Sequence, residues 1–484
     1  MKWVVALGAL LWALGPWGTA RAHGSFLVNT TEDHDDGACE PVSEGDCTLR
    51  EAIIAANTLI NDHPDSPDAI GFDFGPGATP PFTIAIGTPL PAIIEGTIID
   101  GASEPRYILS EQKVPVVVLE GGGVDHLLRV RSDSTLIISL GFDGAAVSAI
   151  DAENADYLLV RGCYFGVDTE TGEPTGLGLP SFGAHAIHVR DTLRARIGGL
   201  DALSRNVVAG AGAEAILIER TDDLLLHGNY VGVDPTGTVP RPNGLTSTIA
   251  YAVEVRASSG VEVVDNVVSS NLGSGIALRD TPEAIFEGNR IGANADGRDA
   301  LGNAGTGLSL SGNIDGLFVR ANVISSNDGD GVRCEGPNEG QWVMLGNMIG
   351  IDVGQSQALA NAGDGVSIAA ACNGAAIGAA SVGQGNVVGH NGLAGIRLAD
   401  GEASVRGNSV FLNGDLGIDA AGDGVTDNDV DDIEMPINFP EVVEIEQLDG
   451  ALGVSGCTRG GAKVDVYEAS PDPSGYGEGK RYLG

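Results

Sequence analysis

Lysine is almost absent from this chain of 484 residues, where it occurs only at Lys2, Lys113, Lys463 and Lys480. Basic residues number 26 against 66 acidic ones, which gives a formal net charge of -40 at pH 7. A chain this acidic repels nucleic acid and anionic membrane surfaces, because both carry dense negative charge. These two classes of partner are therefore excluded, and a polyanionic polysaccharide would bind only if metal ions intervened.

Aromatic residues are also scarce, at 5% of the chain. Three of the four tryptophans lie within the first 17 residues, which leaves only Trp342 for the rest of the chain. Binding platforms for sugars use exposed aromatic rings, which combine an apolar face with a polar edge. A groove for a neutral glycan is thus possible, but few aromatic side chains are available to line it.

Long hydrophobic runs are missing beyond the first residues. The run from Val4 to Leu14 follows Lys2 and precedes Ala20-Arg-Ala22, which is the pattern of a secretory signal peptide over residues 1–22. It is too short for a bilayer span, which takes about 20 residues. We therefore expect no transmembrane segment, and a mature protein that is secreted or held at the cell surface.

The chain does contain a short sequence motif that recurs. Asparagine followed by two small or apolar residues begins at Asn206, Asn266, Asn322, Asn386 and Asn408. A second motif is a glycine followed by a strand of alternating apolar and polar residues. It begins at Gly275, Gly307, Gly331, Gly365, Gly395 and Gly417. These glycines fall at intervals of 22 to 34 residues, with no helical pattern between them.

Repeats of this length, made of short alternating strands and Asn/Gly turns, predict an all-β fold, a parallel β-helix solenoid. Each coil pairs with the next, and the inward residue of every alternation fills a central core. Asparagine tolerates the left-handed conformation at corners, and its amide can bond to the amides above and below. We therefore interpret the repeated asparagines as structural ladders.

The longer intervals contain an additional motif, which begins with asparagine and occurs in alternate coils. It occurs as Asn229-Tyr-Val-Gly-Val-Asp234, Asn289-Arg-Ile-Gly-Ala-Asn294 and Asn347-Met-Ile-Gly-Ile-Asp352, with a degenerate copy at Cys163-Tyr-Phe-Gly-Val-Asp168. Insertions at one register of a solenoid commonly map to its binding face. Our candidate binding residues are Tyr164, Asp168, Tyr230, Asp234, Arg290, Asn294 and Asp352. We also expect that shortening residues 232–241 would hardly change stability, since loop length costs little.

The N-terminal region predicts a cap for the first coil. Thr48 and Glu51 have the spacing of a capping box, so a helix should begin there and run to about residue 60. Such a helix would cover strand edges that otherwise invite aggregation. In an exported protein Cys39 and Cys47 should form a disulfide that closes the loop before the helix.

The segment Cys47-Thr-Leu-Arg-Glu-Ala52 resembles the signature of the CSLREA domain, with Thr48 in place of the usual serine. That domain resembles an N-terminal module of secreted bacterial proteins. The resemblance implies that the region after it is a right-handed parallel β-helix of the pectin-lyase-like kind. It implies a fold and a location much more than a reaction.

The composition changes after residue 420, where the glycine-led strands end. We divide the chain into a signal peptide (1–22), a CSLREA-type cap (23–98), the β-helix (99–420), an acidic linker (421–440) and part of a β-sandwich (441–484). In the last segment the alternation is typical of antiparallel strands. Some forty residues are too few to close a sandwich.

The acidic linker contains the only pattern that suggests a metal. Its oxygen ligands stand at alternate positions, as in calcium loops, at Asp427, Asp429, Asp431 and Glu434. The glycine expected at the sixth position of an EF-hand-like loop is replaced by Asp432. Two interpretations stand, a Ca²⁺ site and a solvated acidic linker.

The candidates for catalysis are weak. Asp222 and Asp223 lie close to His227, but a polygalacturonase sets its paired acids and its histidine on different coils. Basic residues concentrate only in the segment that holds His185, His188, Arg190, Arg194 and Arg196. We therefore expect no catalytic residues and a monomeric scaffold that binds an extracellular glycan or protein through its insertions. The alternative is a polysaccharide lyase or glycoside hydrolase of the pectin-lyase-like fold.

The remaining expectation concerns Cys334, which aligns with apolar residues of the other glycine-led strands. Its side chain should point into the core as an unpaired, unreactive thiol. Cys372 lies four positions beyond the matching strand site, at Ile368. A bridge between Cys334 and Cys372 would require a shift along the coil that the alignment does not allow.

Overall fold

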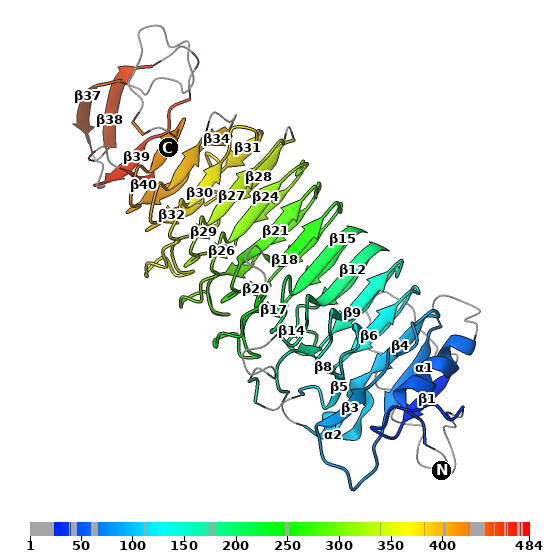
Figure 1. Cartoon of the computed structure of the whole chain (residues 1–484). Coiled ribbons are helices and arrows are strands. Elements are labelled where there is room, and N and C mark those ends of the chain that lie inside the picture. The colour runs from blue at the N-terminus through cyan, green and yellow to red at the C-terminus, as the bar shows by residue number, and fades with distance from the viewer. Residues whose placement is uncertain are drawn as a thin grey trace. The chain divides into compact units, whose positions relative to one another are not determined.

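The computed structural model describes residues 24–484, apart from 38, 40–45, 60–65, 111–112, 170, 174, 176–179, 247–250, 339, 382, 400–402, 423, 426–440, 450, 459–460, 462, 472–474 and 476–477. The predicted signal peptide and the proposed calcium ligands Asp427, Asp429, Asp431 and Glu434 lie outside the described residues. The chain forms two compact units, residues 1–277 and 278–484, each described by itself (Figure 1).

In the first unit, strands of successive coils pair in three parallel sheets, here sheets A, B and C. Sheet A contains β1 (Ser25–Val28), β2 (Asp68–Phe72), β4 (Thr97–Asp100), β7 (Leu136–Ile138), β10 (Leu159–Arg161), β13 (Arg196–Gly198), β16 (Leu225–His227) and β19 (Glu262–Val264). Sheet B contains β3 (Phe82–Ile86), β5 (Val117–Gly121), β8 (Leu140–Asp143), β11 (Tyr164–Phe165), β14 (Val207–Val208), β17 (Tyr230–Val231) and β20 (Val267–Val268). Sheet C contains β6 (His126–Val130), β9 (Ser148–Glu153), β12 (His185–Leu193), β15 (Ile216–Asp222) and β18 (Tyr251–Arg256). The unit boundary falls within β21 (Ser274–Arg279).

The second unit repeats this plan. Sheet A is formed by β22 (Ile285–Glu287), β25 (Phe318–Arg320), β28 (Trp342–Leu345), β31 (Ala375–Ile377) and β34 (Ala403–Val405). Sheet B is formed by β23 (Arg290–Ile291), β26 (Val323–Ile324), β29 (Met348–Ile349), β32 (Val387–Gly389) and β35 (Ser409–Phe411). Sheet C is formed by β24 (Leu308–Ser311), β27 (Val332–Glu335), β30 (Val366–Ile368), β33 (Ile396–Leu398) and β36 (Ile418–Ala420). The predicted all-β solenoid is therefore confirmed.

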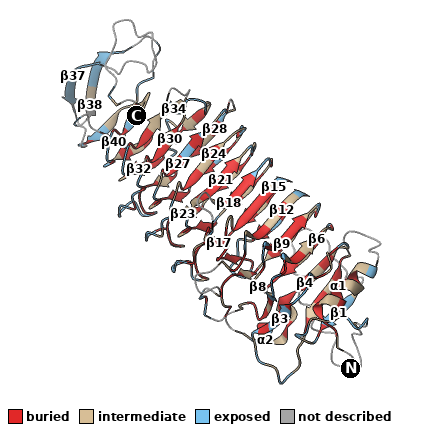
Figure 2. Ribbon diagram, viewed as in Figure 1, coloured by how far each residue is buried: buried red, intermediate tan, exposed pale blue. Residues whose placement is uncertain are grey.

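The alternation of apolar residues explains why these short strands form coils. In most strands of the three sheets the inward residue is buried, as Figure 2 shows along the strands of each unit. In the first unit Phe142 and Phe165 stack with ring centroids 4.8 Å apart. Because a single coil cannot bury its apolar side alone, stacking on the next coil stabilises it.

The asparagine ladders are also confirmed. In the first unit, the side-chain amide of Asn206 donates to the side-chain carbonyl of Asn229, and that of Asn229 donates to Asn266, each at 3.0 Å. In the second unit the ladder runs through Asn289, Asn322, Asn347, Asn386 and Asn408. A further ladder there runs through Asn303, Asn327, Asn361, Asn391 and Asn413. All these amides are buried, so the ladders satisfy donors that burial would otherwise leave costly.

The helix predicted near the N-terminus is α1 (Leu49–Thr58), and its capping box is present between Thr48 and Glu51. The helix contacts the first coils through polar groups. Arg50 donates to the carbonyls of Pro89 and Thr88, and Asn57 donates to the carbonyl of Ala92. The predicted disulfide between Cys39 and Cys47 is confirmed.

The expectation for Cys334 was half wrong. Its side chain is fully buried, in register with Leu310 and Ile368, so its inward position is confirmed. It is nevertheless bridged to Cys372. The reason is a turn after β30, in which the Cys372 amide donates to the carbonyl of Ala369, 2.9 Å away. Because the chain folds back there, Cys372 lies 6.0 Å from Cys334, Cα to Cα.

The C-terminal segment forms two antiparallel hairpins. One pairs β37 (Glu441–Leu448) with β38 (Ala451–Cys457), and the other pairs β39 (Tyr467–Ser470) with β40 (Glu478–Tyr482). In the ladder that runs from Asn303 to Asn413, the last side-chain amide, that of Asn413, donates to Glu478 of β40 at 2.9 Å. The second hairpin thus ends the asparagine ladder of its unit.

Two short helical segments, a 3₁₀ helix (Gly101–Ser103) and α2 (Pro105–Leu109), lie between β4 and β5. None of the helices in the described part of the chain is long and apolar enough to cross a membrane. Both disulfides are typical of an oxidising, extracytoplasmic compartment.

Candidate functional site

The insertion loops are closed hairpins with a common internal structure. In the loop 232–243 the Asp234 amide donates to the carbonyl of Val239 at 2.9 Å, and an isolated bridge pairs Val233 with Pro240. Bridges at the same relative positions close the loops 292–303 and 350–361. These loops are therefore ordered by their own backbone hydrogen bonds.

The acidic or amide residue at the third position of each loop organises its turn. One side-chain oxygen accepts from two backbone amides, four and five residues later, in all three loops. For Asp234 the two distances are 3.0 Å, for Asn294 they are 3.0 and 3.2 Å, and for Asp352 they are 2.6 and 2.7 Å. In the degenerate copy Asp168 accepts from the Thr171 amide at 2.7 Å.

These hydrogen bonds also set the charge state of the loops. Burial alone would raise the pKa of Asp234, but hydrogen bonds from Val239 and its neighbours outweigh it and lower that pKa. The same balance lowers the pKa of Asp352. The carboxylates proposed for binding are thus ionised and already engaged inside their own loops, which leaves the exposed tips to meet a partner.

The loops pack against one another in each unit. In the first unit, Arg241 is 9% exposed and donates its Nε to the carbonyl of Gly172 at 2.7 Å, while its Nη2 pairs with Glu173 at 2.9 Å. In the second unit, the Val353 amide donates to the carbonyl of Gly297 at 2.9 Å. The expectation that shortening residues 232–241 would be nearly neutral needs revision, because this loop is packed structure.

The tyrosines and the arginine of the candidate set lie on strands. Tyr164, Tyr230 and Arg290 each open a strand of sheet B, and the residue after each is buried in the core. Tyr230 is 8% exposed because the guanidinium of Arg205 covers its ring at 3.9 Å. The structure thus separates the candidate residues into outer-face strand positions and loop positions.

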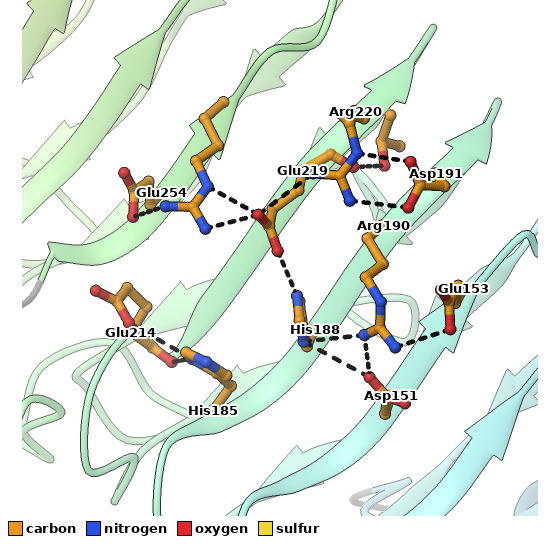
Figure 3. Close-up of polar contacts among 12 residues, drawn as sticks. Asp151, Glu153, His185, His188, Arg190, Asp191, Glu214, Glu219, Arg220 and Glu254 are labelled. Carbon is orange, nitrogen blue, oxygen red and sulfur yellow. Dashed lines mark hydrogen bonds and ion pairs between the residues drawn. The ribbon is translucent and has the colours of Figure 1, made fainter.

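The outer face of sheet C in the first unit carries a cluster of charged side chains (Figure 3). The strand register aligns Glu153, Arg190, Glu219 and Arg256, so that charges of opposite sign alternate from coil to coil. A neighbouring row aligns Asp151 with His188, and the next two strands continue it with Leu217 and Glu254. Opposite charges placed directly across strands stabilise a sheet.

His188 lies at the centre of this cluster (Figure 3). Its Nε2 is 2.8 Å from Glu219, and its Nδ1 is 3.3 Å from Nη1 of Arg190. The same guanidinium contacts Asp151, and its Nη2 donates to Glu153 at 2.9 Å. Because a guanidinium only donates hydrogen bonds, Nδ1 of His188 is the acceptor in its contact with Arg190.

Two acids of this face, Asp151 and Glu219, have lowered pKa values. Burial alone would raise the pKa of Asp151, but hydrogen bonds from Arg190 and Arg131 outweigh it and bring that pKa to about 2. Burial would also raise the pKa of Glu219, but hydrogen bonds with His188 and Arg256 outweigh it and lower that pKa. A carboxyl group that must donate a proton needs a raised pKa, so neither acid suits that role.

The fold agrees with what is known from other proteins. Residues 181–349 match the family model described as a right handed beta helix region. The chain contains a right-handed β-helix. None of the curated proteins matches the chain.

Similar solved structures include the A-module of the mannuronan C-5 epimerase AlgE6 from Azotobacter vinelandii, with 12% identity, a TM-score of 0.37, and 76% of this chain and 93% of that chain covered. The surface adhesin PfbA of Streptococcus pneumoniae has 10% identity and a TM-score of 0.42, with 84% and 95% covered. The periplasmic alginate epimerase AlgG has 11% identity and a TM-score of 0.32, with 70% and 76% covered. At these identities the likeness concerns the fold alone.

The β-helix brings together only part of the basic segment that the sequence singled out. His185, His188 and Arg190 lie on one strand, whereas Arg194 stacks on Tyr157 at a corner and Arg196 belongs to sheet A. His227 is also on sheet A, where it pairs with Glu262 at 3.4 Å, and Asp222 accepts from the Ser259 amide at 2.7 Å. Asp222 and His227 are therefore parts of separate contacts, not of one catalytic pair.

Sequence reasoning missed the acidic partners of His188, because they lie on other coils. Aligning His188-Val-Arg190 with Asp151-Ala-Glu153 would have placed them beside one another, since both are alternating pairs that follow an apolar residue. The unequal insertions between coils hide this register from a fixed-period search.

One group in the described part of the chain has the spacing of a metal site, formed by His34, Asp36 and Glu51. Both carboxylate oxygens of Glu51 already accept backbone amides, from Asp36 and Thr48 at 2.9 Å. We therefore assign Glu51 to the helix cap.

Proposed function

We propose that this chain is an exported or cell-surface β-helix scaffold that binds an extracellular partner, a glycan or a protein, through its insertion loops. The CSLREA-like segment Cys47–Ala52 would then belong to the N-terminal cap of a secreted bacterial protein, and the chain would act as a monomer. Candidate contacts come from the loops around Asp168, Asp234, Asn294 and Asp352.

The observation that carries this proposal is the internal order of the loops. Their turns are closed by backbone bridges and by the side chain at the third position, and they contact a second loop in the same unit. A loop already held in its bound shape loses little conformational entropy when it binds. Ordered loops on a rigid scaffold are the usual design of binding proteins.

The loop tips favour a glycan over a protein. Most of their exposed residues are small or polar, such as Thr238, Asp296, Arg298 and Gln357. The valines Val239 and Val353 are partly exposed beside them. Hot spots of protein interfaces rely on Trp, Tyr and other large anchors in desolvated pockets. Short polar side chains instead suit the hydroxyl groups of sugars.

A matched pair of variants tests the loops. Neither Arg298 nor Gln357 has a side-chain hydrogen bond or ion pair in the described part of the chain, so the double variant Arg298→Ala and Gln357→Ala should fold normally. For a glycan retained by the wild type on a panel of immobilised glycans, this variant should bind about tenfold more weakly. Gln384→Ala, an exposed site outside the loops, should bind like the wild type. Equal affinity of all three proteins would refute the role of these loops.

One observation favours a second function, a polysaccharide lyase or glycoside hydrolase. His188 lies between a carboxylate and a guanidinium on the outer face of sheet C, as a general base could. The lowered pKa values of Asp151 and Glu219 count against it, because no acid of this pair would be available to protonate a leaving group.

A further inference from the structure

Large apolar side chains stand exposed at the corner between sheets A and B of the first unit. Beyond β3, most of these corners hold one or two residues, but two carry insertions, residues 101–116 between β4 and β5 and residues 199–206 between β13 and β14. Each insertion presents two aliphatic side chains that are 52 to 80% exposed, Ile108 and Leu109 in the first and Leu200 and Leu203 in the second. Exposed apolar side chains that gather in one region mark an interaction surface.

Both insertions approach the short corners that lie between them. The Tyr107 hydroxyl of the first insertion is 3.4 Å from Oγ of Ser139. A Cβ atom at Gly162, in the next coil, would lie 3.0 Å from the same Oγ and 2.6 Å from the carbonyl oxygen of Leu203. Because only glycine leaves room for that oxygen, the second insertion reaches back over the corner toward the first.

The length of this surface follows from the spacing of the coils. Sheet A runs β4-β7-β10-β13 and sheet B runs β5-β8-β11-β14, so three coil steps separate the two insertions. Neighbouring strands lie about 4.8 Å apart, which places the insertions about 14 Å apart. An extended chain covers that distance with about four or five residues. The surface therefore has the length to bind a short extended peptide segment.

Two arginines between the apolar pairs lack a carboxylate partner. Arg161 precedes Gly162, whose amide donates to the carbonyl of Ser204 at 3.2 Å, next to Arg205. The Nε atoms of both arginines are buried without a hydrogen-bond partner, and neither guanidinium is ion-paired in the described part of the chain. Arg205 lies flat on the Tyr230 ring, so the edge of its guanidinium is what an acceptor would meet. A buried donor without a partner is costly, so this pair of groups indicates an external acceptor.

The carboxylate of Asp201, within the second insertion, does not supply that acceptor. It accepts from the Ser204 hydroxyl at 2.7 Å and from the amides of Leu203 and Ser204 at 2.9 and 3.0 Å. Asp201 thus fixes the turn of its own insertion.

The side chains of the corner define the class of occupant. Aliphatic groups cannot hydrogen-bond, so they suit apolar side chains better than the hydroxyl groups of a sugar. A guanidinium binds the carboxylate of aspartate or glutamate through two parallel hydrogen bonds. The net charge of -40 disfavours an anionic membrane as the apolar partner. An acidic residue between apolar ones, in a protein, fits both features.

We propose that an extended segment of a partner protein, with large apolar side chains on either side of an acidic one, binds at this corner surface. The surface consists of Ile108, Leu109, Arg161, Leu200, Leu203 and Arg205. It is separate from the insertion loops, which lie between sheets B and C. The inference therefore goes beyond the proposed function and does not rest on it.

Fluorescence polarisation with short labelled peptides tests the occupant. One peptide has leucines on both sides of a central glutamate, a second has lysine in place of the glutamate, and a third has serine in place of each leucine. The protein should bind the first about tenfold more tightly than either of the others, because each of those lacks one part of the recognised pattern. No binding of the first peptide at millimolar concentration, or equal binding of all three, would overturn the proposal.

Matched variants assign the binding to the corner. Leu203→Ser and Arg205→Gln should each weaken binding of the leucine–glutamate peptide about tenfold. The controls change the same kinds of residue in the second unit: Val443→Ser alters an exposed side chain of β37, and Arg320→Gln alters a half-exposed arginine paired with Glu287. Both controls should bind like the wild type. Wild-type affinity in folded Leu203→Ser and Arg205→Gln proteins would overturn the site.

Two further measurements separate this surface from other occupants and from the loops. Dimers of the wild type that vanish in Leu203→Ser, seen by sedimentation velocity, would overturn the proposal, because a second copy of the chain would then occupy the corner. The double variant Arg298→Ala and Gln357→Ala should bind the leucine–glutamate peptide like the wild type, since these residues lie in the loops. Loss of peptide binding in that variant would reject the corner as the binding surface.

Discussion

At the scale of single residues, buried polar side chains stabilise this fold alongside its apolar core. The buried asparagines donate and accept along the coils, and Asp234, Asn294 and Asp352 close their own turns. A polar group that is fully paired costs little to bury, whereas an unpaired one costs about 1–3 kcal/mol. Substituting a member of these networks should therefore lower the free energy of unfolding, because it leaves a buried partner without a hydrogen bond.

Asp151 gives a prediction with a defined pH dependence. Its pKa of about 2 in the folded chain lies below the ordinary 3.8, so its interactions stabilise the fold above about pH 4 and are lost as the pH falls through 2. Asp151→Asn should cost about 1–3 kcal/mol near neutral pH, because charged hydrogen bonds from Arg131 and Arg190 are weakened.

The measurement is urea unfolding of both proteins from pH 7 down to pH 2. The difference in unfolding free energy between wild type and Asp151→Asn should shrink below pH 4. A difference that stays constant down to pH 2 would show that the ion pairs contribute nothing that depends on ionisation.

At the same scale, the sequence predicted positions better than partners. The alignment of glycine-led strands placed Cys334 correctly in the core, because inward and outward positions follow from the period-two alternation. It missed the bridge to Cys372, because the turn after β30 depends on local backbone geometry that the alternation does not encode. The acidic partners of His188 were missed for a related reason, since they come from other coils.

At the scale of elements, the insertion loops are parts of the solenoid and not appendages. The loop 232–243 contacts the loop before it through Arg241, which is almost fully buried. The sequence predicted where the loops occur and that they share one register. It could not predict their packing, because the contact between Arg241 and Gly172 joins residues 69 positions apart.

Arg241→Ala tests this packing. The substitution removes the hydrogen bond to Gly172 and the ion pair with Glu173, so we expect a loss of about 1–2 kcal/mol in the free energy of unfolding. Arg298→Ala, at an exposed position of another loop, serves as the control and should change stability by less than about 0.5 kcal/mol. Thermal and urea unfolding measure both. Equal stability of the two variants would mean that the loop around Arg241 contributes nothing to the fold.

At the scale of the whole molecule, the sequence specifies the solenoid and the elements next to its first and last coils. Coils expose strand edges at their ends, which invite aggregation unless they are covered. In the first unit α1 contacts the first coils through Arg50 and Asn57, and in the second unit Glu478 ends an asparagine ladder. The N-terminal helix was predictable from its capping box, whereas the role of Glu478 depends on a hairpin whose position the sequence does not reveal.

The central claim is that this scaffold binds an extracellular glycan without changing it. Incubating the protein with a panel of glycans, and following both retention and new chain ends by mass spectrometry, tests that claim most directly. The account predicts that at least one glycan is retained intact, and that the Arg298→Ala and Gln357→Ala double variant retains less of it. New unsaturated or reducing ends that disappear in His188→Ala would contradict the account and make the outer face of sheet C an active site.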